Sequence, residues 1–198
     1  HQEGHIAAAL YSAGRLELLN EPFIAFHVSG GTTEAVLVKP DNEHIINAEI
    51  VASSSDLKAG QAIDRVGVML SLGFPAGPEL EKLSEKSNAV FKIKPSMKNT
   101  DCSLSGVENK CKKMLTENYE KSDIALFCID SVIAALDGMY KALMPKYGAL
   151  PVVFSGGVTS NKRIKNYFHD KYNAIFAEPA FSADNAAGTA VLSSIMYD

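Results

Sequence analysis

Apolar residues recur along this chain at two different periods, and the period distinguishes helices from strands. Near the start, Ile6, Leu10 and Ala13 lie three to four residues apart, which is the spacing of one helix face. Short apolar runs bounded by turn residues, such as 23–28, are typical of strands. The predicted elements, in chain order, are a helix at about 1–19, strands at about 23–28, 33–39 and 44–52, a helix over about 63–70, a short helix from Pro78, helices at about 105–118 and 122–146, a strand at about 151–154, a helix from about 160, a strand at about 174–177, and a last helix from 182 or 184 to 196.

The order of these elements predicts an α/β fold. Three strands, several helices, and then strand, helix, strand, helix is the order of one RNase H-like lobe. Such a lobe has a mixed five-stranded sheet flanked by helices, and actin-like ATPases contain two of them. This chain has the elements of one lobe, and its polar stretch at about 87–101 is expected to be a loop or insertion.

Composition and charge are those of an ordinary globular domain. The chain has 198 residues, of which 46% are hydrophobic and 21% charged, enough to build one core. A net charge of −4 argues against a chain that wraps nucleic acid over its whole surface. Basic clusters at 110–113 and 162–165 are, taken as sequence alone, more typical of solvated helix faces than of RNA contacts.

Cysteine usage and hydropathy bear on the compartment. Cys102, Cys111 and Cys128 cannot all pair with one another and form no CxxC motif, which favours reduced thiols in the cytoplasm. Cys128 falls on an apolar helix face and is expected in the core. The sequence contains no apolar stretch of membrane-spanning length and no charged-then-apolar leader, so no membrane partner is expected.

The first candidate site is the turn Ser29-Gly30-Gly31-Thr32-Thr33, which lies between two apolar runs. Strand, glycine-containing tight turn and strand is the pattern of a hairpin. Adjacent glycines let a backbone approach a bulky anion, and hydroxyl and N–H groups at such a turn can hold phosphate oxygens. An ordinary hairpin with no ligand explains the same residues equally well.

Two further segments suit a nucleotide. Gly156 and Gly157 follow a predicted strand and precede a helix, the place where open α/β sheets bind ligands. Asn161 nearby offers hydrogen bonds, although a simple strand-to-helix turn explains the segment too. Gly60 allows close backbone approach, and Asp64 could accept from ribose hydroxyls or assist a cation, as could Asp56; Asp64 could also be merely solvated.

Metal-ligating residues are the third candidate. His1 and His5 are four apart, so on a helix both rings project from one face and can share a metal. Asp184 is the candidate third ligand, and its alternative role is a helix N-cap. Glu3 is two residues after His1, about 200° round a helix, so it points away from the metal face. That geometry argues against metalloprotease chemistry with Glu3 as the base.

These elements occur together and in order, and the set resembles the TsaD/Gcp family, formerly called O-sialoglycoprotein endopeptidases and grouped with the M22 glycoproteases. The segments that carry the resemblance are His1-Gln2-Glu3-Gly4-His5, Ser29-Gly30-Gly31-Thr32-Thr33, Gly60-Gln61-Ala62-Ile63-Asp64, Pro75-Ala76-Gly77-Pro78, Leu104-Ser105-Gly106-Val107, Ser155-Gly156-Gly157-Val158 and Asp184-Asn185-Ala186-Ala187. They span nearly the whole chain.

The resemblance implies an actin-like (ASKHA) protein of two lobes, of which this chain is the second. Residues 1–20 would be the helix between the lobes, and 21–198 the C-terminal lobe with a helical insertion at about 74–120. The implied activity is transfer of threonylcarbamoyl from threonylcarbamoyl-AMP to N6 of adenosine 37 in tRNA, with other threonylcarbamoylation proteins as partners. A divalent metal, iron or zinc, would be held by His1, His5 and Asp184. The implied contacts to ATP or threonylcarbamoyl-AMP are Ser29, Gly30, Gly31, Thr32, Thr33, Gly60, Asp64, Gly77, Gly157 and Asn161.

The sequence also departs from the family pattern. Gln61 stands where the family usually has Glu, Val107-Glu108-Asn109 replaces Leu-Lys-Thr, and Ser182-Ala183 replaces Cys-Thr. These departures favour a divergent paralogue and keep two alternatives open: a non-catalytic ATP-binding scaffold and the older glycoprotease assignment. A chain that begins at His1 is expected to be a fragment, inactive and weak in ATP binding alone, with an apolar face that favours a homodimer.

Overall fold

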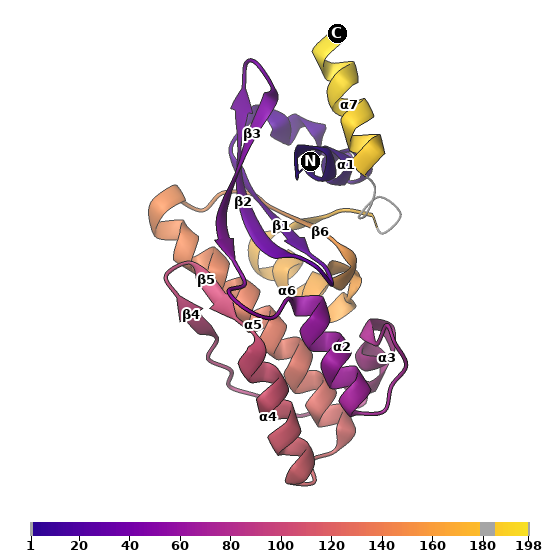
Figure 1. Cartoon of the computed structure of the whole chain (residues 1–198). Helices are drawn as coiled ribbons and strands as arrows, with labels where there is room; N and C mark the ends of the chain where they lie inside the picture. The colour runs from indigo at the N-terminus through magenta and orange to yellow at the C-terminus, as the bar shows by residue number, and fades with distance from the viewer. Residues whose placement is uncertain (1, 179–184, 198) are drawn as a thin grey trace.

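A five-stranded mixed sheet forms the centre of the computed structural model, which describes residues 2–178 and 185–197 (Figure 1). The strand order is β3-β2-β1-β6-β7. The three antiparallel strands are β1 (Phe23–Val28), β2 (Thr33–Asp41) and β3 (Ile45–Ser53). β6 (Val152–Ser155) lies parallel to β1, and β7 (Ile175–Phe176) lies parallel to β6. The predicted fold class is confirmed.

Both faces of the sheet are covered, and side chains of β1 alternate between them. Phe23 and Ala25 pack in the cluster that contains α1 (Gln2–Ser12) and η1 (Leu16–Asn20). Ile24 and Phe26 pack on the opposite side, in the larger cluster formed by the helices. A strand buried on both faces needs apolar side chains at successive positions, which explains the continuous run in the sequence. The helices are α2 (Ala59–Met69), α3 (Gly77–Ser84), α4 (Ser105–Thr116), α5 (Lys121–Tyr147), α6 (Lys162–Tyr172) and α7 (Asn185–Tyr197), with a short η2 (Gly157–Ser160).

The helices α2, α3, α4 and the first half of α5 extend beyond the sheet as a separate layer (Figure 1). A two-stranded hairpin, β4 (Ser96–Lys98) and β5 (Asp101–Ser103), lies beside them. The sequence predicts a loop at about 87–101, so this hairpin is a correction; strands of three residues are too short for a readable period. The first predicted helix is also shorter than expected, since α1 ends at Ser12 before Gly14, whose φ is +65°.

All three cysteines are buried free thiols. Burial raises the pKa of the Cys102 thiol to about 11, and a contact with Cys111 together with burial raises the pKa of Cys128. The thiols of Cys102 and Cys128 therefore remain protonated at neutral pH, and Cys128 packs in the larger core as predicted. Among the described helices, none is both long and apolar enough to cross a membrane.

Candidate functional site

The two glycine turns meet at one edge of the sheet. β1 and β6 are parallel neighbours, and their register pairs His27 with Ser155, so both strands end side by side. β1 is followed directly by Ser29-Gly30-Gly31, and β6, which ends at Ser155, is followed directly by Gly156-Gly157. Turns that follow neighbouring parallel strands form the carboxyl edge of the sheet, where ligands bind in open α/β folds.

The turn after β1 is closed by its own serine. The N–H of Ser29 donates to the carbonyl of Thr32 at 2.8 Å, and Ser29 Oγ accepts from the N–H groups of Gly31 (3.3 Å) and Thr32 (3.1 Å). These bonds use the lone pairs of the hydroxyl and leave its O–H as a donor. The N–H groups of Ser29, Gly31 and Thr32 are therefore used within the turn, which leaves fewer donors for a phosphate than the sequence suggests.

Thr33 is a correction to the predicted ligand set. Its side chain has no exposed surface, and its hydroxyl donates to the carbonyl of Thr32 at 2.9 Å. The same oxygen accepts from the N–H of Ala59 at 2.9 Å, at the first residue of α2. Thr33 therefore ties the turn to the start of α2 and has no atom available to a nucleotide.

Gly60 and Gly156 are needed for backbone packing. A Cβ on Gly60 would lie 2.7 Å from the Cα and N of Gly30, closer than real side chains approach a backbone. A Cβ on Gly156, whose φ is +99°, would overlap the carbonyl oxygen of Val28. In contrast, no atom outside its local chain lies within 4 Å of the Cβ position of Gly30, Gly77 or Gly157 among the described residues.

A cavity of about 320 Å³ lies between these segments, a volume in the range of small-molecule sites. Six of the ten predicted nucleotide contacts line it, from four separate stretches of chain: Gly30, Gly60, Asp64, Gly77, Gly157 and Asn161. Ser29, Gly31, Thr32 and Thr33 lie outside its lining. The remaining walls are mostly apolar and come from Ile63, Pro75, Pro78, Leu80, Glu81, Ile129, Val158 and Ser160.

The polar groups of the cavity are held by bonds to neighbouring backbone. Asp64 Oδ1 accepts from the N–H of Ala76 at 2.8 Å and so fixes the loop that leads into α3. Asn161 Oδ1 caps α6 by accepting from the N–H groups of Arg163 (3.0 Å) and Ile164 (3.1 Å), and its NH₂ takes no part in these two bonds. Glu81 was not predicted; its carboxylate accepts from the N–H of Lys162 at 2.7 Å and joins α3 to α6.

A pair of histidines lies beside the turns. The rings of His5 on α1 and His27 on β1 have centroids 5.4 Å apart, and His27 Nδ1 lies 3.0 Å from Ser155 Oγ. Burial lowers the pKa of His27, and the electrostatic interaction with the neighbouring His5 ring lowers it further. His27 was missed because its position on a strand end does not reveal a neighbour twenty-two residues earlier.

The predicted metal ligands are only partly within the described residues. His1 and Asp184 lie outside them, and no group of three His, Cys, Asp or Glu suited to a metal occurs within the described part. A Cβ on Gly188 would overlap the carbonyl of Gly4, so α7 and α1 touch next to His5. The contact brings the start of α7, which follows Asp184, close to the histidine-bearing helix. Of the three predicted ligands, the described residues therefore hold His5, on a helix that α7 contacts.

Asp56 has a structural role. Its carboxylate accepts from the N–H of Leu57 (2.6 Å) and Leu104 (2.8 Å) and from the hydroxyl of Ser103 (2.6 Å). Burial alone would raise the pKa of Asp56, but hydrogen bonds from Ser103, Ser105 and the backbone outweigh it and hold the pKa well below its usual range. The Asp56 carboxylate thus fixes the start of α4, and this structural role accounts for it without a ribose or a cation as partner.

A larger hollow of about 1020 Å³ lies between α3, the segment 87–95, α5 and α6. None of the predicted site residues lines it. Several of its charged groups form ion pairs, since Asp130 holds Arg163 through two bonds and Asp137 holds Lys141 and, outside the lining, Lys171. The smaller cavity, with convergent polar groups and open glycines, is the better candidate site.

Sequence comparison identifies relatives over almost the whole chain. The sequence model of one family, described as "TsaD: tRNA N6-adenosine threonylcarbamoyltransferase", matches residues 1–191. A protein of that name from Kosmotoga olearia is 32% identical over 202 residues, which cover 97% of this chain and 59% of the relative. The protein of that name from Clostridium novyi is also 32% identical, over 94% of this chain and 58% of its own length. The chain thus spans about three-fifths of the length of these curated relatives.

Solved structures share the fold at low sequence identity. Full-length HypF in its phosphate- and nucleotide-bound form superposes with a TM-score of 0.78 at 14% identity, over 100% of this chain and 42% of that one. The activator of the 2-hydroxyisocaproyl-CoA dehydratase from Clostridium difficile, with bound ADPNP, gives 0.60 at 18% identity, over 99% of this chain and 66% of that one. These similarities establish an actin-like ATPase fold.

Proposed function

Because the chain belongs to the TsaD family of tRNA N6-adenosine threonylcarbamoyltransferases, we propose that it supplies the nucleotide-holding lobe of such an enzyme. The observation that carries the proposal is the cavity, where six residues predicted to contact a nucleotide meet around one space of about 320 Å³. The relatives are longer, so the activity of the complete protein, its tRNA substrate and its protein partners are part of the proposal.

The cavity suits the adenosine of threonylcarbamoyl-AMP or ATP. Asp64 offers its second carboxylate oxygen to ribose hydroxyls, and the NH₂ of Asn161 offers donors to the base. The open positions of Gly77 and Gly157 give a flat ring room to approach the backbone. The Ser29 hydroxyl and the Gly30 backbone would face the phosphate end.

The proposed reaction joins the N6 nitrogen of adenosine 37 to the carbamoyl carbon of the donor. The bond from that carbon to the phosphate oxygen breaks, AMP leaves with the electron pair, and N6 loses one proton. His1, His5 and Asp184 would hold a divalent metal, iron or zinc, which supplies Lewis-acid polarisation of the carbamoyl oxygen when bound. The contact between Gly4 and Gly188 supports this set because it brings α7, which follows Asp184 in the sequence, against α1, which carries His5.

The residue Gln61 has a local role that bears on the scaffold alternative. Its Oε1 accepts from the N–H of Lys58 at 3.1 Å, as the N3 residue of a capping box at the start of α2. Glutamate serves equally well in that position. Compared with the glutamate that is usual in the family, Gln61 therefore lacks a charge but keeps the cap. We expect the variant Gln61→Glu to leave transfer unchanged.

Transfer of label from threonylcarbamoyl-AMP to tRNA by the full-length protein tests the proposal. We expect labelled adenosine 37 when a divalent metal and the partner proteins are present. Absence of label, with the donor shown to be intact and the tRNA competent with a known enzyme, would contradict it.

A further inference from the structure

One stretch of this acidic chain carries a strong positive charge. The 28 residues from Lys86 to Lys113 contain seven lysines and two carboxylates, a balance of +5 in a chain whose net charge is −4. The other 170 residues therefore carry −9. All seven lysines are exposed. Such asymmetry within one domain indicates a polyanionic partner for the basic part.

Three of these lysines lie on an extended segment whose alternate residues are fixed against α5. The ring of Phe91 meets that of Phe127 edge-on, at 5.3 Å between centroids. Met97 and Pro95 close over Gly138, where a Cβ would lie 2.9 Å from the Met97 sulfur. With odd positions facing the helix, the even positions face solvent, about 6.6 Å apart. The exposed lysines on these even positions are Lys92, Lys94 and Lys98.

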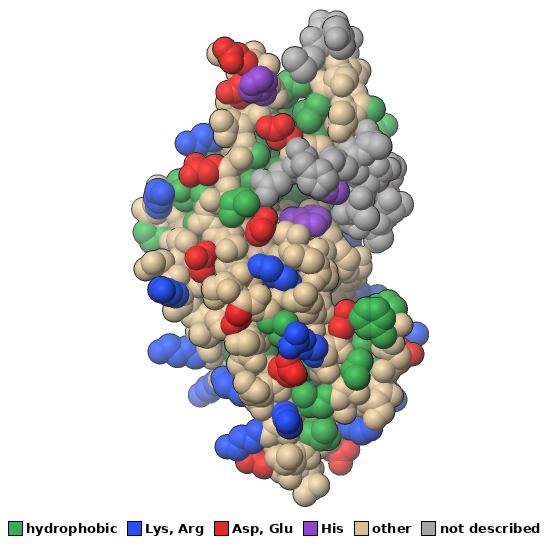
Figure 2. Space-filling model, viewed as in Figure 1, with side chains coloured by type: hydrophobic (Ala, Val, Ile, Leu, Met, Phe, Trp, Pro, Cys, Tyr) green, Lys and Arg blue, Asp and Glu red, His purple; other side chains and the backbone are tan. Residues whose placement is uncertain are grey.

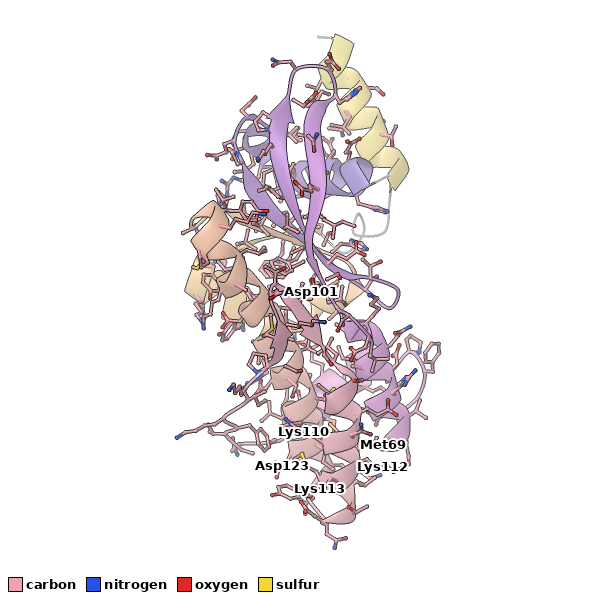
Figure 3. All side chains as sticks on the ribbon, turned by 60° about the vertical axis from the view of Figure 1, so that its left-hand side comes forward. Met69, Asp101, Lys110, Lys112, Lys113 and Asp123 are labelled. Atoms are coloured by element: carbon pink, nitrogen blue, oxygen red, sulfur yellow. The ribbon has the colours of Figure 1, made fainter. Side chains whose placement is uncertain are left out.

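Three more lie on α4, and the seventh, Lys86, lies at the start of the stretch. Val107, Cys111 and Met114 are buried and hold this helix on the core. Lys110, Lys112 and Lys113 are exposed. Lys112 lies two residues after Lys110, about 200° round the helix and on the side of Glu108 and α2, and Figure 3 shows it beside Met69 of α2, across from Lys110. The lysines Lys92, Lys94, Lys98, Lys110 and Lys113 are called the lysine face below.

The β4–β5 hairpin brings the two groups together. The segment enters β4 at Ser96, which pairs with Ser103 at the end of β5, and α4 begins at Ser105. Both elements then descend from the hairpin along α5 (Figures 1 and 3). In Figure 2, Lys and Arg side chains run down the left-hand margin on this side of the molecule.

Neighbouring carboxylates leave most of this charge unneutralised. Asp101 accepts from the N–H of Ser53 at 2.8 Å, and Glu108 pairs with Arg65 at 3.0 Å. Among the described residues, the ion pair that the lysine face makes is Lys113 with Glu117, at 3.6 Å.

The second basic cluster of the sequence differs. Its arginine, Arg163, is held by Asp130 through two hydrogen bonds, and Lys165 lies over the ring of Phe176 at 5.7 Å. Arg163 and Lys165 are thus engaged within the fold. The sequence alone indicates a solvated helix face for both clusters, and the structure shows that they differ.

We propose that the lysine face binds the phosphate backbone of the RNA substrate. This inference rests on the proposed function, which supplies an RNA as the acceptor. Lysines on a fixed surface neutralise phosphates and release counterions, and they read no sequence. The face lies outside the nucleotide cavity, so it would hold the body of the RNA while one adenosine reaches the reacting carbon.

Three variants of the full-length protein test this inference. K92Q/K94Q/K98Q removes three charges from the lysine face, and K110Q/K113Q removes the other two. K39Q/K82Q/K146Q removes three charges from exposed lysines elsewhere and is the matched control. All of these side chains are exposed, so thermal melts of the three variants should match the parent. Affinity for tRNA is measured by fluorescence anisotropy between about 50 and about 200 mM salt.

We expect both lysine-face variants to lose affinity at least about 10-fold at low salt, with a salt slope smaller by about 0.7–0.9 per phosphate contact removed. The control should stay within about 2-fold, and an unrelated RNA of equal length should compete, because phosphate contacts carry no sequence information. Equal loss in the control, or unchanged affinity and slope in both lysine-face variants, would overturn the inference.

Steady-state transfer by the same variants separates this inference from the proposed function. The KM for tRNA should rise while kcat changes little, since the lysines do not touch the reacting atoms. Transfer with an unaltered KM would refute the lysine face and leave the function standing. Tight, lysine-dependent RNA binding without transfer would refute the function and leave the lysine face standing.

Discussion

Gly156 and Gly157 are neighbours in one turn, yet glycine is needed at the two positions for different reasons. The Cβ position of Gly156 is filled by the backbone of Val28, whereas that of Gly157 opens on the cavity. Gly60 and Gly77 form a second pair of this kind. The backbone of Gly30 blocks the Cβ position of Gly60, whereas the Cβ position of Gly77 is open. A glycine-rich motif therefore contains two kinds of glycine, one that lets backbones pack and one that leaves room for a ligand.

The largest expected effect comes from closing the packed position after β6. Gly156→Ala should destabilise the fold by about 3–5 kcal/mol in urea denaturation, because the new methyl group meets backbone that cannot move aside. Gly148→Ala is the control for φ alone, since Gly148 has φ +81° and open space around its Cβ position. It should cost about 1–3 kcal/mol. Equal losses for the two would show that the clash does not matter.

The second pair separates stability from ligand affinity. Gly60→Ala should cost about 2–3 kcal/mol because it pushes on the Gly30 turn. Gly77→Ala should leave urea stability unchanged or raise it by about 0.4–1 kcal/mol, and should weaken AMP binding in calorimetry because its methyl group enters the cavity. Full AMP affinity in Gly77→Ala would mean that the open position does not face the nucleotide.

Asn161 combines a packing role and a ligand role in one side chain. Asn161→Asp keeps the oxygen that caps α6 and removes the NH₂ donors, so stability should hold while AMP affinity falls about 10-fold, which is about 1.4 kcal/mol. Asn161→Ala should lose the affinity and also about 1 kcal/mol of stability. If Asn161→Asp binds AMP as tightly as the parent, the amide makes no contact with the base.

The smallest effect concerns Asp56, which lies away from the cavity. Its pKa is depressed in the folded state, so its contribution to stability is complete above the unfolded pKa of about 3.9 and is lost as pH falls from there toward the folded pKa. Urea stability of the parent should therefore fall more steeply between about pH 5 and about pH 3 than that of Asp56→Asn, by less than about 1 kcal/mol since the side chain is exposed. Identical pH profiles of the parent and Asp56→Asn would show that the Asp56 carboxylate does not stabilise the start of α4.

The sequence predicts features that are local and misses those set by distant contacts. β1 has the predicted bounds, 23–28, because a continuous apolar run between turn residues has few alternatives. The glycine turns were found because glycine marks unusual backbone. The burial of Thr33 and the approach of His27 to His5 were not predictable, since each depends on a partner from another element. The short β4–β5 hairpin escaped because three residues carry no period.

A crystal structure of the full-length protein with a non-hydrolysable analogue of threonylcarbamoyl-AMP tests the central claim most directly. We predict the adenosine in the cavity of about 320 Å³, with ribose at Asp64, base at Asn161, and the rings over Gly77 and Gly157. Adenosine bound elsewhere, for example in the hollow of about 1020 Å³ between α3 and α6, would contradict the account.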